Sequence, residues 1–250
     1  MTSYTSFALF YDDLTRNIDY GARARYFAEL LRRHSRRDPQ TLLDLACGTG
    51  SLSYRFSAMG YDVIGVDSSS DMLSAAAAKG AGAERAPLFI CQDMRELDLY
   101  GTVDACVCAL DSINHLPDKP ALDKAAAKVS LFLAPGGVFI FDVNTGYKHR
   151  ELLGNNVYVY DLDTVYCVWR NAYRPKDGQV EITLDFFRPG KGGGYTRTGE
   201  YFTERLFSTG QIKSALDGAG LELLAVYGGD GFEPPGKKSQ RAVYVAGKPI

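Results

Sequence analysis

The stretch from Leu42 to Gly50, which reads Leu-Leu-Asp-Leu-Ala-Cys-Gly-Thr-Gly, decides the fold of this 250-residue chain. It is an apolar run that ends in small residues, which predicts a buried strand followed by a tight turn. Gly48 and Gly50 let the backbone approach a ligand closely. A second apolar run, Tyr61 to Val66, ends in Asp67, whose carboxylate can accept hydrogen bonds from both hydroxyls of a ribose. A glycine-rich turn followed by such an acid predicts a nucleoside cofactor.

Two kinds of cofactor fit this turn. A dinucleotide site uses Gly-x-Gly-x-x-Gly and places a pyrophosphate at a helix N-terminus, but Ser53 stands at the third glycine position. Asp44 precedes the turn, where an acid repels a pyrophosphate and suits the ammonium group of an amino acid. Together Asp44, Ala46, Gly48 and Gly50 resemble the D-x-G-x-G-x-G loop of class I S-adenosylmethionine-dependent methyltransferases, with Ala46 in place of the first glycine. An NAD(P)-dependent oxidoreductase is the less favoured reading.

The resemblance continues in order along the chain. It implies cofactor contacts for Ser68, which follows the ribose acid, and for Met72 over one face of the adenine. It also implies that Asp93 accepts from the adenine amino group and that the backbone of Met94 reaches a ring nitrogen. Leu110, which ends the expected fourth strand, completes the implied cofactor set.

Further motifs resemble small-molecule methyltransferases, such as sugar N,N-dimethyltransferases and glycine N-methyltransferase. Uncharacterised bacterial relatives open with Tyr-x-x-Phe-Ala-x-x-Tyr-Asp, which Tyr4 to Asp12 match, and carry Asp-Ser-Ile-Asn-His, found here at Asp111 to His115. A late Glu-x-x-x-x-Glu-Arg is matched by Glu200, Glu204 and Arg205. The resemblance implies S-adenosylmethionine as cofactor and methyl transfer to N or O of a small-molecule acceptor. The alternative within this resemblance is a protein that binds S-adenosylmethionine without transferring its methyl group.

Three side chains are candidates for catalysis. His115 follows the fourth strand, where open α/β sheets keep their chemistry, and it can serve as a general base or as a loop histidine bonded to backbone. Tyr11 and Tyr20 can orient the acceptor or close over the cofactor, or they can pack the N-terminal segment. No Asn/Asp-Pro-Pro-Tyr and no Pro-Cys follows the fourth strand, as base-modifying enzymes would have.

The expected fold is α/β, a doubly wound Rossmann-like seven-stranded methyltransferase sheet with an inserted antiparallel β lid. The cofactor domain comprises residues 1–146 and 208–250, including a helical N-terminal segment at 1–38, and the lid subdomain comprises 147–207. Between Val157 and Phe207 lie β-branched and aromatic runs separated by Gly- and Pro-containing turns, which predict three or four strands. This fifth of the chain holds eleven of its thirty aromatic residues, so we expect the acceptor to bind there.

Composition limits the other classes of function. The net charge of −2 shows no basic footprint for nucleic acid, and three histidines without ligand-type spacing predict no metal site. Five cysteines do not form a disulfide pattern, and no apolar run approaches 20 residues. We therefore expect a cytoplasmic protein, monomeric or homodimeric, with no nucleic-acid or membrane partner.

Overall fold

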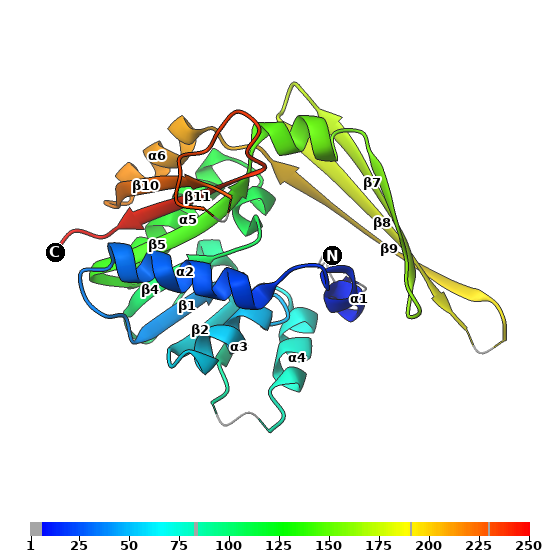
Figure 1. The fold of residues 1–250 in the computed structure, drawn as a ribbon, viewed down its shortest axis with the longest axis horizontal. Helices are drawn as coiled ribbons and strands as arrows, with labels where there is room; N and C mark the ends of the chain where they lie inside the picture. Colours follow the sequence, from blue (N-terminus) through cyan, green and yellow to red (C-terminus); the bar gives the residue numbers. More distant parts are fainter. Residues whose placement is uncertain (1–6, 83–84, 191, 230) are drawn as a thin grey trace.

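Seven strands form the main sheet of the computed structural model, which describes residues 7–82, 85–190, 192–229 and 231–250 (Figure 1). Their order is β10-β11-β5-β4-β1-β2-β3, and β11 runs antiparallel to both of its neighbours. The strands are β1 (Thr41–Leu45), β2 (Asp62–Asp67), β3 (Leu88–Cys91), β4 (Val103–Cys108), β5 (Leu133–Asn144), β10 (Glu222–Gly228) and β11 (Arg241–Gly247). The predicted doubly wound, seven-stranded methyltransferase sheet is confirmed. Of the opening motif, Tyr4 lies outside the described residues.

Helices cover both faces of this sheet, because side chains of its strands alternate between two apolar clusters. In β1, Leu42 packs with α2 and α3, whereas the next residue, Leu43, packs with α5 and α6. Each fully buried leucine contributes about 1.5–3 kcal/mol. The α-helices of this domain are α2 (Tyr20–His34), α3 (Ser51–Ala58), α4 (Ser70–Lys79), α5 (Lys119–Phe132) and α6 (Thr209–Gly218). Short helices η1 (Met94–Glu96) and η2 (Ser112–His115) follow β3 and β4.

The N-cap of α4 is Ser69, whose side chain accepts from the amide of Met72 at 3.3 Å. Ser69 sits in extended backbone, as an N-cap does, while Ser70 is already helical. Three adjacent serines all have the right side chain, so composition alone could not choose between them.

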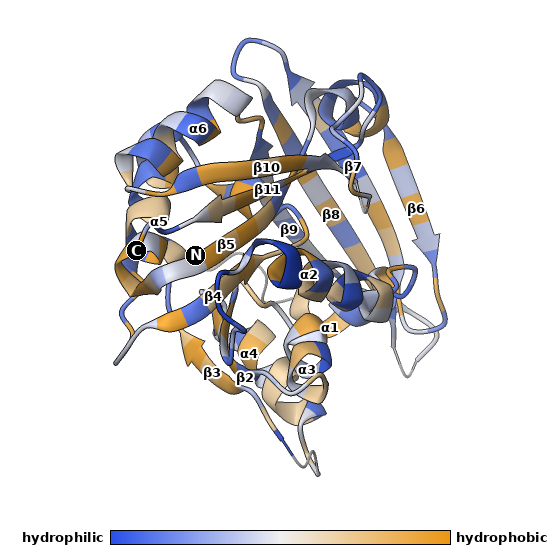
Figure 2. Ribbon diagram, turned by 60° about the vertical axis from the view of Figure 1, so that its left-hand side comes forward, coloured by the Kyte–Doolittle hydropathy of each residue, from blue (hydrophilic) through white to orange (hydrophobic). Residues whose placement is uncertain are grey.

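The insertion after β5 forms a second, antiparallel sheet in the order β6-β7-β8-β9, as predicted. Its strands are β6 (Val157–Asp161), β7 (Tyr166–Arg174), β8 (Gln179–Pro189) and β9 (Tyr195–Arg205), preceded by the π-helix η3 (Lys148–Leu153). Hydrophobic and hydrophilic bands alternate along β8 (Figure 2). The alternate buried residues Val180, Ile182, Leu184 and Phe186 mark the face that is turned inward. We call this sheet the lid.

The helix α1 (Phe7–Leu14) lies under the lid, within the N-terminal segment 1–38 that the sequence analysis expects to be helical. Phe7, Phe10 and Leu14 are buried in one cluster with the inner face of the lid and with Met72 of α4. The ring of Phe10 stacks on Phe186 of the lid at 5.4 Å. The helix therefore joins the lid to the cofactor half (Figure 1).

Candidate active site

The turn after β1 has the left-handed backbone that its sequence indicates. The φ angles of Ala46, Gly48 and Gly50 are 58°, 55° and 72°. A Cβ on Gly48 would meet nothing within 4 Å, and Gly48 lines the cavities described below, so a side chain would enter ligand space. Glycine is needed at position 50 for a different reason, because a Cβ there would lie 2.8 Å from the ring of Phe89. Ala46 holds this conformation despite its Cβ, at a cost of about 1–2 kcal/mol.

Asp67 ends β2 directly beside this turn. One carboxylate oxygen accepts from the amide of Gly48 at 2.9 Å, and the other accepts from the amide of Ser69 at 2.9 Å. Burial raises the pKa of Asp67, and the two amide hydrogen bonds oppose that rise. Each oxygen keeps a further lone pair for a ligand hydroxyl. Asp67 and Ser68 line both large cavities of the site, as a ribose-binding pair would.

Asp44 is buried at the floor of a small cavity that Tyr11, Tyr20 and Leu110 also line. The hydroxyl of Ser53 donates to its carboxylate at 2.5 Å. Burial raises the pKa of Asp44 to about 7, and the charge of Asp67 adds to the rise. A buried carboxylate of this kind suits a ligand ammonium group, which would compensate its charge.

A cavity of about 380 Å³ extends from Asp67 along the end of β3. Asp93, Met94 and Arg95 line it. Arg95 donates to both oxygens of Asp93, at 2.9 and 2.5 Å, and lowers the pKa of that carboxyl. A ligand amino group would therefore share Asp93 with Arg95. Met72 does not line this cavity; it lines the next one, beside α1.

The largest cavity, about 450 Å³, lies between the cofactor turn, α1 and the lid. His115 lines it, and the ring of His115 lies 5.3 Å from that of Phe202 in β9. Of the thirteen residues predicted from the sequence, twelve line one or more of the three cavities: Tyr11, Tyr20, Asp44, Ala46, Gly48, Asp67, Ser68, Met72, Asp93, Met94, Leu110 and His115. Gly50 instead shapes the turn.

The sequence analysis did not identify one charged group on the wall of this cavity. Arg241, at the start of β11, lies 2.6 Å from Asp111 and also pairs with Asp142 of β5. Burial favours the neutral acid, but the charges of Arg241, Lys148 and His115 lower the pKa of Asp111 well below its ordinary value. Both Leu110 and Asp111 have left-handed backbone, with φ of 58° and 56°. Strain of this kind costs about 1–3 kcal/mol per residue and marks functional loops. No local pattern links Arg241 to a loop so distant in sequence.

A second polar group comes from the lid. Glu204 of β9 is 4% exposed and lines the cavity. Its carboxylate accepts from Asn144 at 2.7 Å and lies 3.2 Å from the ring nitrogen of His149. Lys148 in turn donates to Asn144 at 2.9 Å.

Glu204, Asp111 and His115 can each offer one ligand atom, and these atoms lie within 4.8 Å of one another. This is the arrangement that could hold a metal ion. Because the guanidinium of Arg241 already compensates Asp111, the cluster suits a hydrogen-bonding ligand better than a dication.

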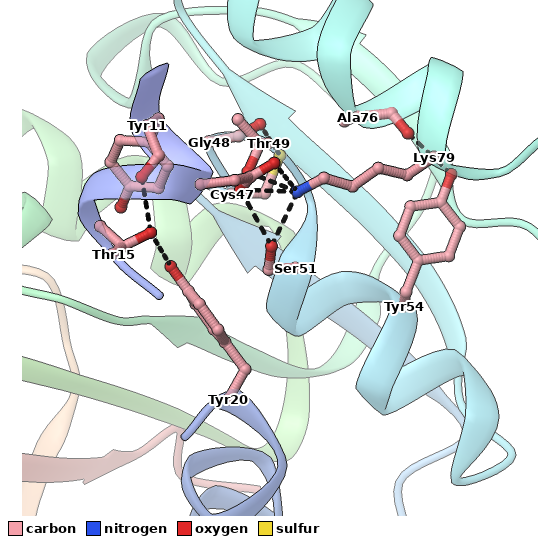
Figure 3. A network of polar contacts seen from close by, with 11 residues as sticks. Tyr11, Thr15, Tyr20, Cys47, Gly48, Thr49, Ser51, Tyr54, Ala76 and Lys79 are labelled. Atoms are coloured by element: carbon pink, nitrogen blue, oxygen red, sulfur yellow. Dashed lines mark hydrogen bonds and ion pairs between the residues drawn. The ribbon is translucent and has the colours of Figure 1, made fainter. Parts of the chain in front are cut away.

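Figure 3 shows how the N-terminal segment is tied to the cofactor turn. The ammonium of Lys79 donates to the hydroxyl of Thr49 and to the hydroxyl of Ser51, each at 2.8 Å. It also donates to the carboxylate of Asp12 in α1. The hydroxyl of Tyr20 donates to Thr15 at 3.0 Å, and burial raises its pKa. The hydroxyl of Tyr20 is thus hydrogen-bonded to another residue of the N-terminal segment.

Within the described ranges, no helix has the length and apolar character needed to cross a membrane.

Comparison with known proteins agrees with this geometry. The Methyltransferase domain family matches residues 42–137. The YqeM protein of Bacillus subtilis, whose name marks it as an inferred methyltransferase, is 30% identical over 98% of this chain and 97% of its own length. The crystal structure of an S-adenosylmethionine-dependent methyltransferase from Clostridium acetobutylicum superposes with a TM-score of 0.86, at 32% identity, over 99% of both chains.

One relative carries a defined substrate in its name. The dTDP-3-amino-3,6-dideoxy-alpha-D-glucopyranose N,N-dimethyltransferase of Streptomyces fradiae is 28% identical over 84% of this chain and 81% of its own length. Sugar N,N-dimethyltransferases and glycine N-methyltransferases both occur among the matches, so the predicted resemblance is confirmed. The matches do not favour the oxidoreductase or the binding protein without transferase activity.

Proposed function

The chain belongs to the S-adenosylmethionine-dependent methyltransferases, and we propose that it transfers the methyl group to a nitrogen of a small-molecule acceptor held under the lid. The observation that carries this proposal is the cavity of about 450 Å³, which the cofactor turn and the lid line together. A cavity of this size takes a metabolite or an amino sugar and excludes a folded macromolecule.

The cofactor residues divide by the part of the ligand that they meet. Asp44 would hold the ammonium of the methionine end, since it is a buried carboxylate beside Gly48. Asp67 and Ser68 would hold the ribose, and Asp93 with Met94 the adenine. S-adenosylmethionine supplies a methyl group already activated on a sulfonium, so the protein has to align the acceptor, exclude water and manage a proton.

We propose residues 147–207 as the acceptor lid. Tyr160, Trp169 and Phe202 bring aromatic surface from three lid strands to the cavity, and α1 closes its other side with Phe7 and Tyr11. Aromatic walls keep water from the reacting atoms. Polar groups of Asp111, Asn144 and Glu204 also line the cavity, so an acceptor with one apolar face and one nitrogen-bearing face is expected.

His115 is the proposed general base. It lines both large cavities, next to the ribose acid Asp67 and below the lid residue Phe202. An amine is protonated near neutral pH and must lose a proton before its lone pair can attack. Tyr11 would orient the acceptor, because it lines the cavities on both sides of the turn. We propose Tyr20 as a residue that closes over the methionine end.

Nitrogen rather than oxygen transfer is proposed because the cavity wall carries two carboxylates, Asp111 and Glu204, besides His115 and the ribose acid Asp67. The named acceptor of the Streptomyces relative, an amino sugar nucleotide, supports the same assignment. The test is a methyl-transfer assay with labelled S-adenosylmethionine on a panel of amines and their hydroxyl counterparts. The amine panel contains that dTDP-amino sugar, glycine and sarcosine. Transfer to hydroxyl compounds alone would contradict the proposal.

We also propose that the enzyme works in the cytoplasm. All five cysteines are free, including the partly exposed Cys47 of the cofactor turn, and free thiols are typical of a reducing compartment. The site is built from one chain, so a monomer and a homodimer are both compatible with it. We also propose that neither nucleic acid nor a membrane is a partner.

A further inference from the structure

Glu204 stands in the acceptor cavity with a role that the proposed function does not assign. It comes from β9 of the lid, it is buried, and it lines the cavity opposite the cofactor turn. One of its oxygens, Oε2, accepts from the amide of Asn144 at 2.7 Å and faces the Nε2 atom of His149 at 3.2 Å. Both contacts are made by the same oxygen, to residues at the end of β5 and in η3.

The surrounding charges leave Glu204 suited to a cationic ligand. Asp111 is compensated by Arg241 at 2.6 Å, and Lys148 donates to Asn144 rather than to Glu204. The partners that bind Glu204 are an amide and an imidazole. In a buried site, a carboxylate held by such partners interacts strongly with any positive charge that appears beside it.

Resting on the proposed transfer to nitrogen, we propose that Glu204 is a catalytic carboxylate that accepts a hydrogen bond from the acceptor nitrogen and stabilises the positive charge developing there. His149 and Asn144 are its positioning residues. Glu204 and His115 offer atoms within 4.8 Å of each other, so one nitrogen can contact both.

The separate roles of Glu204 and His115 follow from where electrons and protons move during methyl transfer. The lone pair of nitrogen forms the new bond to the methyl carbon while the bond between that carbon and sulfur breaks, and its electron pair stays on sulfur. Nitrogen becomes positive as this happens. Glu204 stabilises that charge without taking a proton, because the proton that freed the lone pair has already passed from the acceptor nitrogen to His115, and the methylated nitrogen leaves as an ammonium group.

The burial of His149 supports the positioning role. Its ring is fully buried, and its Nδ1 atom has no hydrogen-bond partner among the described residues. A buried polar atom without a partner destabilises the folded state. The contact with Glu204 offsets this destabilisation, which is why we assign His149 the role of positioning that carboxylate. A contact between the lid and η2 also fixes the position of Glu204. The carbonyl of the adjacent Arg205 accepts a hydrogen bond from the side chain of Asn114 of η2 at 2.7 Å.

The first experiment uses trimethylammonium as a probe, measured by saturation-transfer NMR on the full chain with S-adenosylhomocysteine present. Glu204→Gln keeps the size and hydrogen bonding but loses the charge, and should weaken probe binding at least fivefold. Glu200→Gln is the matched control, since Glu200 lies in the same strand and outside the lining of the cavities. Affinity for S-adenosylhomocysteine should stay within twofold in both variants, which shows that they are folded. Equal probe binding by the two variants would overturn the proposal.

The second experiment uses the best amine of the transfer panel. Glu204→Gln should lower kcat at least 30-fold, and His149→Asn should lower kcat with little change in KM. The double variant should be no slower than Glu204→Gln alone, because His149 acts through Glu204. Additive losses would show that His149 is merely structural. Unchanged kcat in Glu204→Gln would overturn the proposal while transfer to nitrogen stands, whereas a wild-type chain that methylates no amine would defeat the proposed function on its own.

Discussion

The ammonium group of Lys79 lies 2.7 Å from the carboxylate of Asp12 and so ties α4 of the cofactor half to α1 under the lid. The same ammonium lies 2.8 Å from the hydroxyl of Thr49 in the cofactor turn (Figure 3). One cation therefore holds the N-terminal helix over the cofactor site. Because α1 also lines the acceptor cavity through Phe7 and Tyr11, the same helix borders both subsites.

Lys79→Met should speed the release of S-adenosylhomocysteine. The ion pair is partly exposed, so its contribution is about 1 kcal/mol or less, which corresponds to at most about a fivefold faster release. Stopped-flow tryptophan fluorescence measures the rate, with Trp169 of the cavity wall as the reporter. Lys213→Met is the control, because Lys213 forms an exposed pair with Asp217 within α6. Equal rates in the two variants would show that the contact does not hold the helix closed.

Asp67→Ala should weaken cofactor binding at least tenfold. The loss includes the hydrogen bonds to the ribose, each worth roughly 1.5–3 kcal/mol for a charged acceptor, and the anchoring of the Gly48 amide. Calorimetry with S-adenosylhomocysteine measures the change. Asp62→Ala, at the start of the same strand and paired only with the exposed Arg85 among the ion pairs of the described residues, should bind normally. A folded Asp67→Ala protein with unchanged affinity would remove Asp67 from the site.

Cofactor binding should release a proton below about pH 7. Burial raises the pKa of Asp44 to about 7 in the free protein, so the carboxyl is protonated below that pH, whereas a bound ammonium group favours the carboxylate. Affinity should therefore increase as the pH rises from about 5 to about 7 and then level off. Calorimetry at pH 6 in buffers of different ionisation enthalpy detects the proton directly. Asp44→Asn should abolish the buffer dependence, and a wild-type heat independent of buffer would contradict the assignment.

The same pKa has a consequence for stability. A folded-state pKa above the ordinary value of 3.8 favours folding at low pH, and this contribution is lost as the pH rises through about 7. The free Asp44→Asn protein should therefore gain thermal stability over wild type at pH 8 and lose most of that advantage at pH 5. Calorimetric unfolding at both pH values checks the sign, and an advantage confined to pH 5 would contradict it.

The fold could be predicted because its signals are local. A strand, a glycine turn and a terminal acid stand within one stretch of chain, and the structure brings that acid, Asp67, to the Gly48 amide of the turn. The cofactor roles of these residues stay predictions. The acceptor wall could not be predicted in the same way. Arg241 at the start of β11 reaches Asp111, which follows β4, across the intervening strand β5, and Glu204 meets His149 only after the lid folds back.

The helix α1 lies in the N-terminal segment that was expected to be helical, but its bounds could not be read from the sequence. Its buried residues Phe7, Phe10 and Leu14 follow helical spacing, but a run of eight residues is too short to form a stable helix by itself. Its partners are the lid and α4, and burial by both makes it helical. Its Tyr11 was selected from a motif, and the structure adds the reason, a place between the small and large cavities.

His115→Asn should lower turnover strongly and leave cofactor affinity intact. Asparagine keeps a hydrogen-bonding side chain of similar reach but cannot take a proton, and general-base help is worth roughly 10²–10⁴-fold. Since imidazole is the side chain that ordinarily changes charge near neutral pH, the pH dependence of kcat/KM should also flatten there. The labelled-methyl assay on the best amine gives both quantities. A variant with near-normal turnover and the wild-type pH profile would make His115 structural. Alignment by Tyr11 and stabilisation by Glu204 would then account for the rate.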